Sequence, residues 1–503
     1  MLKNFMAVLL ASIFIVPCAY AEDLQTKKLP LSIQDCIKKT LEQNLELKVQ
    51  TYSQKLALIN EQKTLDDFGI SLGFEPSINQ SVSASATSFI SGGNLLKEFS
   101  QRYDLYLKKN FDFGGNLSFK FQNSILNTNS TRADINPSIT PTFSLNFSQP
   151  LLRDGFNGMK YISIDKNNTI SSKYQLKDKA IQLVARTQDA YWNLVLSKER
   201  LKVLENSIKL AQDLLEINKQ KEKSGFLAKI DILSTEASIA SRETSVLEAQ
   251  KGVILNENNL KKLLNMSKDG LQDWEYDIEP IDKPAFKNID INFKKSLDTA
   301  FSKRPDYQVT LLEQKNLDIQ HDIATQNKLP SLNFNGSAGL EGLDSSYPSA
   351  LGKVFGFQNY FWNFGLNFEL PVVGNKQETL YKESEIKQEQ EKAVLDNLKQ
   401  EIYLDVKNSV TNVEINKKRI QANILAKKLA DEQVKAETEK LNLGLSTNFQ
   451  VLQFQRDYEQ ASLNEINATV DYIKSVNELA QLEGVLLENN NIVWDIDNEN
   501  SHK

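Results

Sequence analysis

The chain has 503 residues, enough for two to four domains, and its formal charge of −6 is too small to indicate a nucleic-acid partner. Charged residues make up 25% of the sequence, which is typical of a chain in wide contact with water. The only histidines are His321 and His502, and no nucleophile motif, phosphate-binding loop or metal-spaced cysteine–histidine set occurs. The sequence therefore favours a protein that is not an enzyme and has no cofactor and no metal site.

The first segment, residues 1–21, has the pattern of a secretory signal peptide. A positively charged start precedes an apolar run over 5–16, and a small-x-small cleavage site follows it. The apolar run is too short to span a membrane comfortably. Lipidation at Cys18 is an alternative, but Pro17 directly before it fits a lipoprotein signal poorly.

Long stretches of the chain have helical periodicity, with apolar residues on one side only. A helix of 66 residues would be about 100 Å long, far beyond the average of globular proteins. Richness in Gln, Asn, Lys, Glu and Leu suits coiled-coil packing with one side in water. Pro305 marks either the start of a helix or a kink. The predicted helices cover 31–68, 158–223, 229–266, 291–327, 375–442 and 447–486.

Between the helices, apolar and polar residues alternate as in strands. The clearest segments are 360–370, 143–148, 117–125 and 103–113, with weaker alternation at 78–87 and 332–340. An antiparallel sheet on a soluble core would also alternate, but the heavily aromatic side and the secretion signal favour a membrane β-barrel. No later stretch approaches 18 apolar residues, so strands would have to make any crossing. The predicted membrane-facing aromatic residues are Phe143, Phe147, Tyr360, Trp362, Phe364 and Phe368.

The chain consists of two copies of one plan. Residues 44–46 correspond to 304–306, Pro150 to Pro371, and Gly225 to Gly444. The predicted organisation is a first repeat over 22–288, with strands at about 76–149 and a hairpin tip near 225. A second repeat follows over 289–488, with strands at about 332–370 and a tip near 444, and then a tail over 489–503.

The predicted strands are too few to close a barrel within one chain, because barrels need about eight strands. Three copies with four strands each would give about twelve, and three copies with six would give about eighteen. The first repeat has 39 more residues than the second between its first helix and its matching proline, Pro150. These residues predict one additional hairpin, over 103–125, turning at Gly114 and Gly115.

The chain resembles the TolC family of outer-membrane efflux and secretion proteins. The resemblance rests on the two-copy plan, on "QPLLRDG" and "LPVVGN" at strand-to-helix junctions, on "YWNLVLSKERL" in a long helix, and on "SGFLAKIDIL" and "LGLSTNFQVL" at helix breaks. It implies a mainly α fold, with an α-helical barrel and a membrane β-barrel built by a homotrimer. It also implies an outer-membrane location with a long periplasmic extension, and docking to a periplasmic adaptor and an inner-membrane transporter. Small molecules or proteins would pass through the common pore.

The resemblance also gives the helix breaks a role, as the periplasmic tip of the channel. It implies adaptor docking at Gly225, Phe226, Leu227, Gly444, Leu445, Ser446 and Thr447. It implies a pore constriction at Asp231, Leu441, Ser446, Gln450 and Gln453. The best-known members carry an aspartate ring where Gln450 and Gln453 stand, and a tyrosine and an arginine where Leu441 and Ser446 stand. We therefore expect a constriction lined by neutral amides, which nearby acidic residues such as Asp457 would modify.

Two expectations remain open at this stage. The family pattern favours twelve strands, with residues 103–125 outside the barrel wall, over eighteen. The alternative function is a periplasmic coiled-coil adaptor or scaffold without a pore. An adaptor would show one hairpin flanked by compact β-domains, and a scaffold would lack the aromatic strands.

Overall fold

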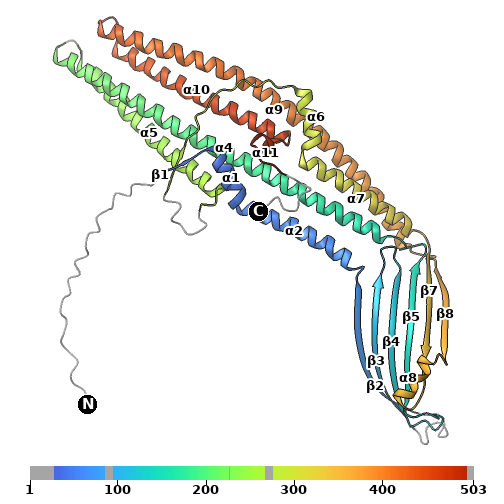
Figure 1. Cartoon of the computed structure of the whole chain (residues 1–503). Helices are drawn as coiled ribbons and strands as arrows, with labels where there is room; N and C mark the ends of the chain where they lie inside the picture. Colours follow the sequence, from blue (N-terminus) through green and yellow to red (C-terminus); the bar gives the residue numbers. More distant parts are fainter. Residues whose placement is uncertain (1–27, 85–94, 226, 267–275, 495–503) are drawn as a thin grey trace, which may run out of the picture.

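The computed structural model describes the whole chain except residues 1–27, 85–94, 226, 267–275 and 495–503. The predicted signal peptide, Cys18, Phe226 and most of the predicted tail therefore lie outside the described residues. Figure 1 shows an elongated molecule, with a bundle of long helices at one end and a sheet at the other. Within the described residues, no helix combines the length and the apolar character that a membrane span requires.

Four long helices form two hairpins that lie side by side (Figure 1): α4 (Gly158–Lys223), α5 (Lys229–Leu263), α9 (Lys376–Asn442) and α10 (Asn448–Leu482). The helices α4 and α9 have 66 and 67 residues, which corresponds to about 100 Å each. Their observed bounds agree with the spans predicted from helical periodicity. Contacts between α4 and α10 hold the first hairpin against the second.

Four shorter helices connect the hairpins to the sheet: α1 (Ile33–Gln43), α2 (Leu45–Asp66), α6 (Phe293–Lys303) and α7 (Pro305–Asn327). The predicted single helix over 31–68 is therefore wrong, because it is divided in two at Asn44. The span 291–327 is also divided, and of the two alternatives for Pro305 the structure shows the start of a helix. Asn44 caps α2 by accepting a hydrogen bond from the Glu46 backbone N–H at 2.8 Å. Pro305 opens α7, where its missing N–H costs nothing.

Six of the described strands form one antiparallel sheet in the order β2-β3-β4-β5-β7-β8 (Figure 1). They are β2 (Ile70–Ala84), β3 (Leu95–Asn110), β4 (Asn116–Thr128), β5 (Ser138–Pro150), β7 (Ser331–Glu341) and β8 (Tyr360–Glu369). The preference for placing residues 103–125 outside the wall is wrong. The hairpin β3–β4 lies inside the sheet, because β3 pairs with β2 and β4 pairs with β5 over most of their lengths.

The two faces of this sheet differ in chemistry. The ladder places Leu72, Leu107, Phe119, Leu145 and Ala338 in one continuous row, and we call this side the apolar face. The other side, which we call the polar face, carries mainly Ser, Thr and Asn, with charged residues on some strands. The short helix α8 (Tyr347–Phe355) lies on the apolar face, because the Phe355 and Phe143 rings are 5.8 Å apart.

A belt around the middle of the helices ties the two repeats together. Here β1 (Lys28–Leu31) pairs in parallel with β6 (Asp277–Pro280), and the short helix α11 (Leu486–Asn489) packs on α4. The Tyr191 hydroxyl donates a hydrogen bond to Asp282 at 2.8 Å, and Cys36 is fully buried in the same apolar cluster. Burial raises the pKa of the Cys36 thiol to about 12, so this thiol is unreactive at neutral pH.

Candidate functional site

Both hairpin tips contain a glycine in a left-handed backbone conformation. Gly225 follows α4 with a φ of 74°, and Gly444 follows α9 with a φ of 77°. Both values lie in the left-handed region, where glycine avoids the strain that a Cβ atom brings. Nothing lies within 4 Å of the position that a Cβ would occupy at either glycine. The backbone turn, and not close packing, therefore requires glycine at both tips.

The second tip is better capped than the first. The Thr447 hydroxyl accepts a hydrogen bond from the Gln450 backbone N–H at 3.4 Å, as the Thr-x-x-Gln pattern predicts. The Gln450 side chain accepts instead from Ser446, at 3.1 Å. In the first tip, the N-cap residue of α5 is Ala228, which makes no side-chain cap.

Within one chain, the five predicted constriction residues do not form a single cluster. Leu441 is buried among Leu214, Val451 and Leu452, so it supports the tip from inside. The other four, Asp231, Ser446, Gln450 and Gln453, are partly or fully exposed on α5 and on the α9–α10 tip.

Carboxylates lie beside two of the predicted constriction residues. The Ser446 hydroxyl donates to Glu437 at 2.5 Å, and Gln453 donates to Asp457 at 3.1 Å. The Ser446 hydroxyl and, less strongly, Lys440 hold the pKa of the Glu437 carboxyl below its usual range. One of the neutral amides predicted for the constriction, Gln453, therefore has an anionic neighbour, and so does Ser446.

A buried amide–hydroxyl network joins the two tips, and sequence analysis missed it. Asn218 donates to Asn448 at 2.8 Å and to Thr235 at 3.0 Å. Asn448 in turn donates to Thr235 at 3.0 Å and to the Asp231 carbonyl at 3.1 Å. Asn218, Thr235 and Asn448 are at most 2% exposed. The available signal was Asn218 itself, a polar residue four positions after the buried Leu214 on the core side of α4.

Large apolar side chains surround this network at the tips. Leu443 and Leu445 are each 75% exposed, and Phe449 is 68% exposed. On the first hairpin, Ile230 and Leu233 are also largely exposed. Sequence analysis had named only Leu445 of these five. An exposed apolar group at the end of a hydrophilic bundle is typical of a docking surface.

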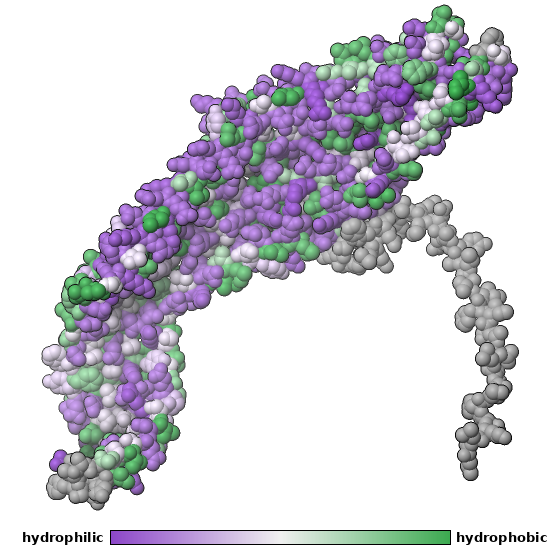
Figure 2. Space-filling model, turned by 180° about the vertical axis from the view of Figure 1, so that it is seen from behind, coloured by the Kyte–Doolittle hydropathy of each residue, from purple (hydrophilic) through white to green (hydrophobic). Residues whose placement is uncertain are grey.

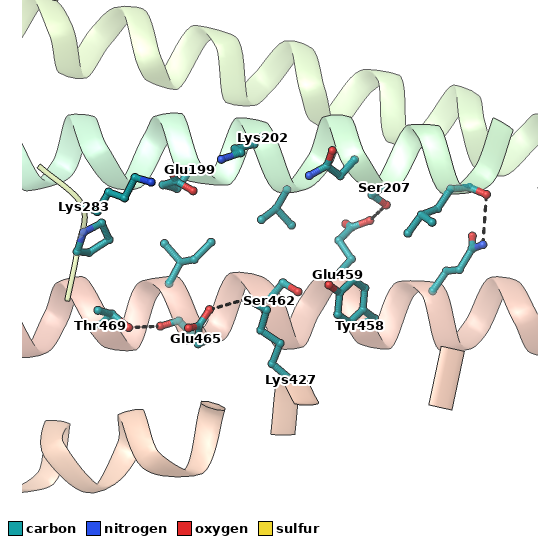
Figure 3. Close-up of a pocket in the computed structure, with 16 residues that line it drawn as sticks. Glu199, Lys202, Ser207, Lys283, Lys427, Tyr458, Glu459, Ser462, Glu465 and Thr469 are labelled. Atoms are coloured by element: carbon teal, nitrogen blue, oxygen red, sulfur yellow. Dashed lines mark hydrogen bonds and ion pairs between the residues drawn. The ribbon is translucent and has the colours of Figure 1, made fainter. Parts of the chain in front are cut away.

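Further along the bundle, charged side chains join the hairpins. Arg242 of α5 donates to the Ser207 carbonyl of α4 at 2.9 Å and pairs with Glu459 of α10 at 3.5 Å. Figure 3 shows Ser207 and Glu459 hydrogen-bonded at a cavity of about 380 Å³ between α4 and α10, with both polar and apolar residues in its lining. Burial lowers the pKa of the Arg242 guanidinium. This pair is therefore an electrostatic connection between the first and second hairpins.

The surface of the described helices is mainly polar. The face seen in Figure 2 is mainly hydrophilic along the helices, with scattered hydrophobic patches. Among the described residues, no group of His, Cys, Asp and Glu side chains is arranged to hold a metal ion.

On the sheet, all six predicted membrane-facing aromatic residues share the apolar face. Rows of them pack across strands, with Phe147 and Phe334 rings 6.2 Å apart and Phe334 and Phe364 rings 6.1 Å apart. Trp362 is 67% exposed although it is a large aromatic residue. The protein therefore presents an apolar wall on one side of its sheet and a polar wall on the other.

This combination of a two-sided sheet and paired 100 Å helices can be compared with known proteins. A family model described as outer membrane efflux protein matches residues 114–266 and 297–485, one segment in each repeat. The chain belongs to this family. The resemblance to TolC-type outer-membrane efflux channels is confirmed, and so is the mainly helical, two-repeat fold.

Solved structures of outer-membrane channels have the same fold as this efflux-family chain. The channel CmeC of Campylobacter jejuni is similar with a TM-score of 0.68 and 15% identity, over 90% of this chain and 86% of CmeC. VceC of Vibrio cholerae has a TM-score of 0.64 and 14% identity, over 90% of this chain and 96% of VceC. The open state of MtrE from Neisseria gonorrhoeae has a TM-score of 0.62 and 16% identity, over 90% and 89%. No curated protein sequence matches the chain.

Proposed function

We propose that this efflux-family chain is an outer-membrane export channel in which three copies enclose a single pore. The six-stranded sheets join into a β-barrel of about eighteen strands in the membrane. The helical hairpins join into a tube that extends into the periplasm and receives cargo from an adaptor and an inner-membrane transporter. Cargo, either small molecules or proteins, leaves through the barrel.

This proposal rests mainly on the two edge strands of the sheet, β2 and β8, each of which has a partner strand on one side. Among the described strands, β2 pairs only with β3 and β8 pairs only with β7. In a bilayer, each unpaired backbone group at such an edge would cost several kcal/mol, about 2–7 by transfer measurements. Pairing β8 of one copy with β2 of the next removes both edges.

The geometry of the edges suits a ring of identical copies. Six alternating strands leave β2 and β8 running in opposite directions, so the junction between copies is antiparallel like the rest of the sheet. Leu72 and Phe74 of β2 lie on the same face as Phe364 and Leu366 of β8. The apolar face therefore continues across the junction, as a head-to-tail ring requires.

Interchain crosslinking tests this assembly. A single cysteine at Leu72 would be combined with a second at position 360, 362, 364, 366 or 368 in turn. Oxidation in outer-membrane fractions should yield covalent dimers and trimers for at least one pair. A purified protein that conducts ions in planar bilayers but crosslinks at none of these pairs would refute the β2–β8 junction. A monomer without conductance would favour the alternative, a periplasmic adaptor or scaffold.

The hairpin tips then form the periplasmic end of the pore. We infer that Gln450 and Gln453, with Ser446 and Asp231, line its constriction, and that Leu441 supports it from inside. The exposed Leu443, Leu445 and Phe449 would receive the adaptor, together with Thr447, Leu227 and the two tip glycines. Phe226, which was predicted to dock as well, lies outside the described residues. A ring of amides gives little discrimination between ions by charge. Asp457, which accepts a hydrogen bond from Gln453, and Glu437, which accepts one from Ser446, are carboxylates beside this ring.

Bilayer conductance distinguishes the amides from the carboxylate. If the amides dominate, Asp457→Asn leaves the cation preference of the closed state unchanged, and Gln453→Glu increases it. If Asp457→Asn abolishes a strong cation preference or a block by divalent cations, the neutral constriction is refuted. Gln460→Glu, on an exposed position of α10, is the matched control for added charge.

A further inference from the structure

Charged side chains on the polar face are concentrated on three neighbouring strands. The polar face of β2, β3 and β4 carries Glu75, Glu98, Arg102, Asp104, Lys108 and Lys120. On β5, β7 and β8 the same face carries only Glu341 and Glu369, each the last residue of its strand. Most charged residues of the polar face therefore lie on β3 and β4, which form the hairpin that the second repeat lacks.

Three of these groups form a bonded cluster in the middle of the face. The Asp104 carboxylate lies 3.0 Å from Arg102 Nε and 2.8 Å from Lys120 Nζ. Arg102 Nη2 also donates to Gln122 of β4 at 2.8 Å. The Tyr106 hydroxyl, also on β3, donates to Glu75 of the neighbouring strand β2 at 3.2 Å.

The cations of this cluster contact water more than the carboxylate does. The Arg102 and Lys120 side chains are 44% and 28% exposed, whereas that of Asp104 is 6% exposed. One carboxylate thus holds two cations in place and neutralises only one of them. The exposed part of this three-residue cluster is cationic, and the exposed Glu75, which is paired in register with Asp104, places a second negative charge beside it.

We propose that Arg102 and Lys120, positioned by Asp104, form an anion-contact site in the β-barrel section of the pore, with Glu75 as its opposing charge. This inference rests on the proposed channel, in which the polar face lines the pore. Each copy would contribute one such site, so permeating anions, or the carboxylate and phosphate groups of cargo, would meet a ring of cationic groups inside the membrane. Rings of charged side chains set ion selectivity in other pores.

Reversal potentials of the reconstituted full-length channel in a KCl gradient test the site. Lys120→Gln removes one cation but leaves Asp104 paired with Arg102, so the strand pairing should persist. We expect the ratio of chloride to potassium permeability to fall by about twofold or more. Glu75→Gln keeps the hydrogen bond from Tyr106 and removes a negative charge, so the ratio should rise by a similar factor of about two.

Lys109→Gln is the matched control, because Lys109 lies on β3, between the strands of Glu75 and Lys120, but on the apolar face. It should leave the permeability ratio unchanged. Conductance with the same ratio in the Lys120 and Glu75 variants would overturn this inference and leave the channel intact. Absence of conductance in the unmodified protein would overturn the proposed channel together with the site.

Discussion

The side-chain amide of Asn218 lies 2.8 Å from the side-chain oxygen of Asn448, and this hydrogen bond joins two helical hairpins whose bonded residues are 230 positions apart. Both residues are buried, and Thr235 bonds to each of them. A neutral network of this kind holds the tips together without an ion pair. Its strength should therefore depend little on salt, in contrast to a contact between exposed charges.

Asn448→Ala should loosen the junction between the tips. The substitution leaves Asn218 without its bond to Asn448, and a buried unpaired polar group costs about 1–3 kcal/mol. We expect a lower unfolding midpoint in detergent and a higher resting conductance in bilayers. Asn464→Ala, at an exposed position on the same helix, is the control. Equal effects of the two substitutions would show that the network does not hold the tips.

Glu46 should contribute a pH-dependent part of stability. Hydrogen bonds from Arg186 and Lys179 lower the pKa of its carboxyl to about 2. Because the folded-state pKa is lower than the ordinary value of 4.5, the stabilisation is complete above pH 4.5 and is lost as the pH falls toward 2.

The test compares Glu46→Gln with the unmodified protein across this pH range. Since Glu46 is 47% exposed, the loss at neutral pH should not exceed about 1 kcal/mol. The difference between the two unfolding midpoints should shrink below pH 4.5 and disappear near pH 2. A difference that stays constant down to pH 2 would assign the effect to packing and not to charge.

Substitution by alanine should reduce stability by different amounts at two glycines that have similar backbone angles. Gly444 has a φ of 77° in open surroundings, so Gly444→Ala should cost only the left-handed strain, about 1–2 kcal/mol. Gly484 has a φ of 73°, and its added Cβ would lie 2.8 Å from the Lys303 carbonyl oxygen. Gly484→Ala should therefore lower the unfolding midpoint further. If Gly444→Ala were the more damaging of the two, the tip would be more tightly packed than the structure shows.

Adjacent substitutions on β8 test which face of the sheet contacts lipid. Trp362→Lys places a charge on the apolar face, which in a membrane barrel costs about 2–4 kcal/mol near the bilayer centre. We expect less heat-stable oligomer in the outer membrane. Asn363→Lys, one residue later on the polar face, should assemble normally. Normal assembly of the Trp362 variant would exclude lipid contact at that position.

The sequence correctly predicted those helices and strands whose pattern of apolar and polar residues lies within the element itself. Period and glycine placement located α4 and its end before Gly225, and the alternation at Tyr360–Glu369 identified a strand and its two faces. The break at Asn44 was missed, because asparagine is tolerated inside a helix and its capping bond to Glu46 depends on local backbone geometry.

The remaining features depend on contacts between residues far apart in the chain. The alternation in residues 103–125 is the same whether this hairpin is inside or outside the sheet, since only its partners β2 and β5 decide that. Similarly, Asn218 could be seen to lie on a core position, but nothing local to it identifies Asn448 as its partner. The four-residue strand β1 is too short to show a period.

The parallel ladder between β1 and β6 has a consequence for the order of events during synthesis. Lys28 has Asp277 as its partner, 249 residues later in the chain. Translation proceeds from the N-terminus, so β1 has no strand to pair with until more than half of the polypeptide has been made. The first strand of the described chain thus finds its partner only after the first sheet strands and the first helical hairpin have been made, and until then this part of the belt cannot form.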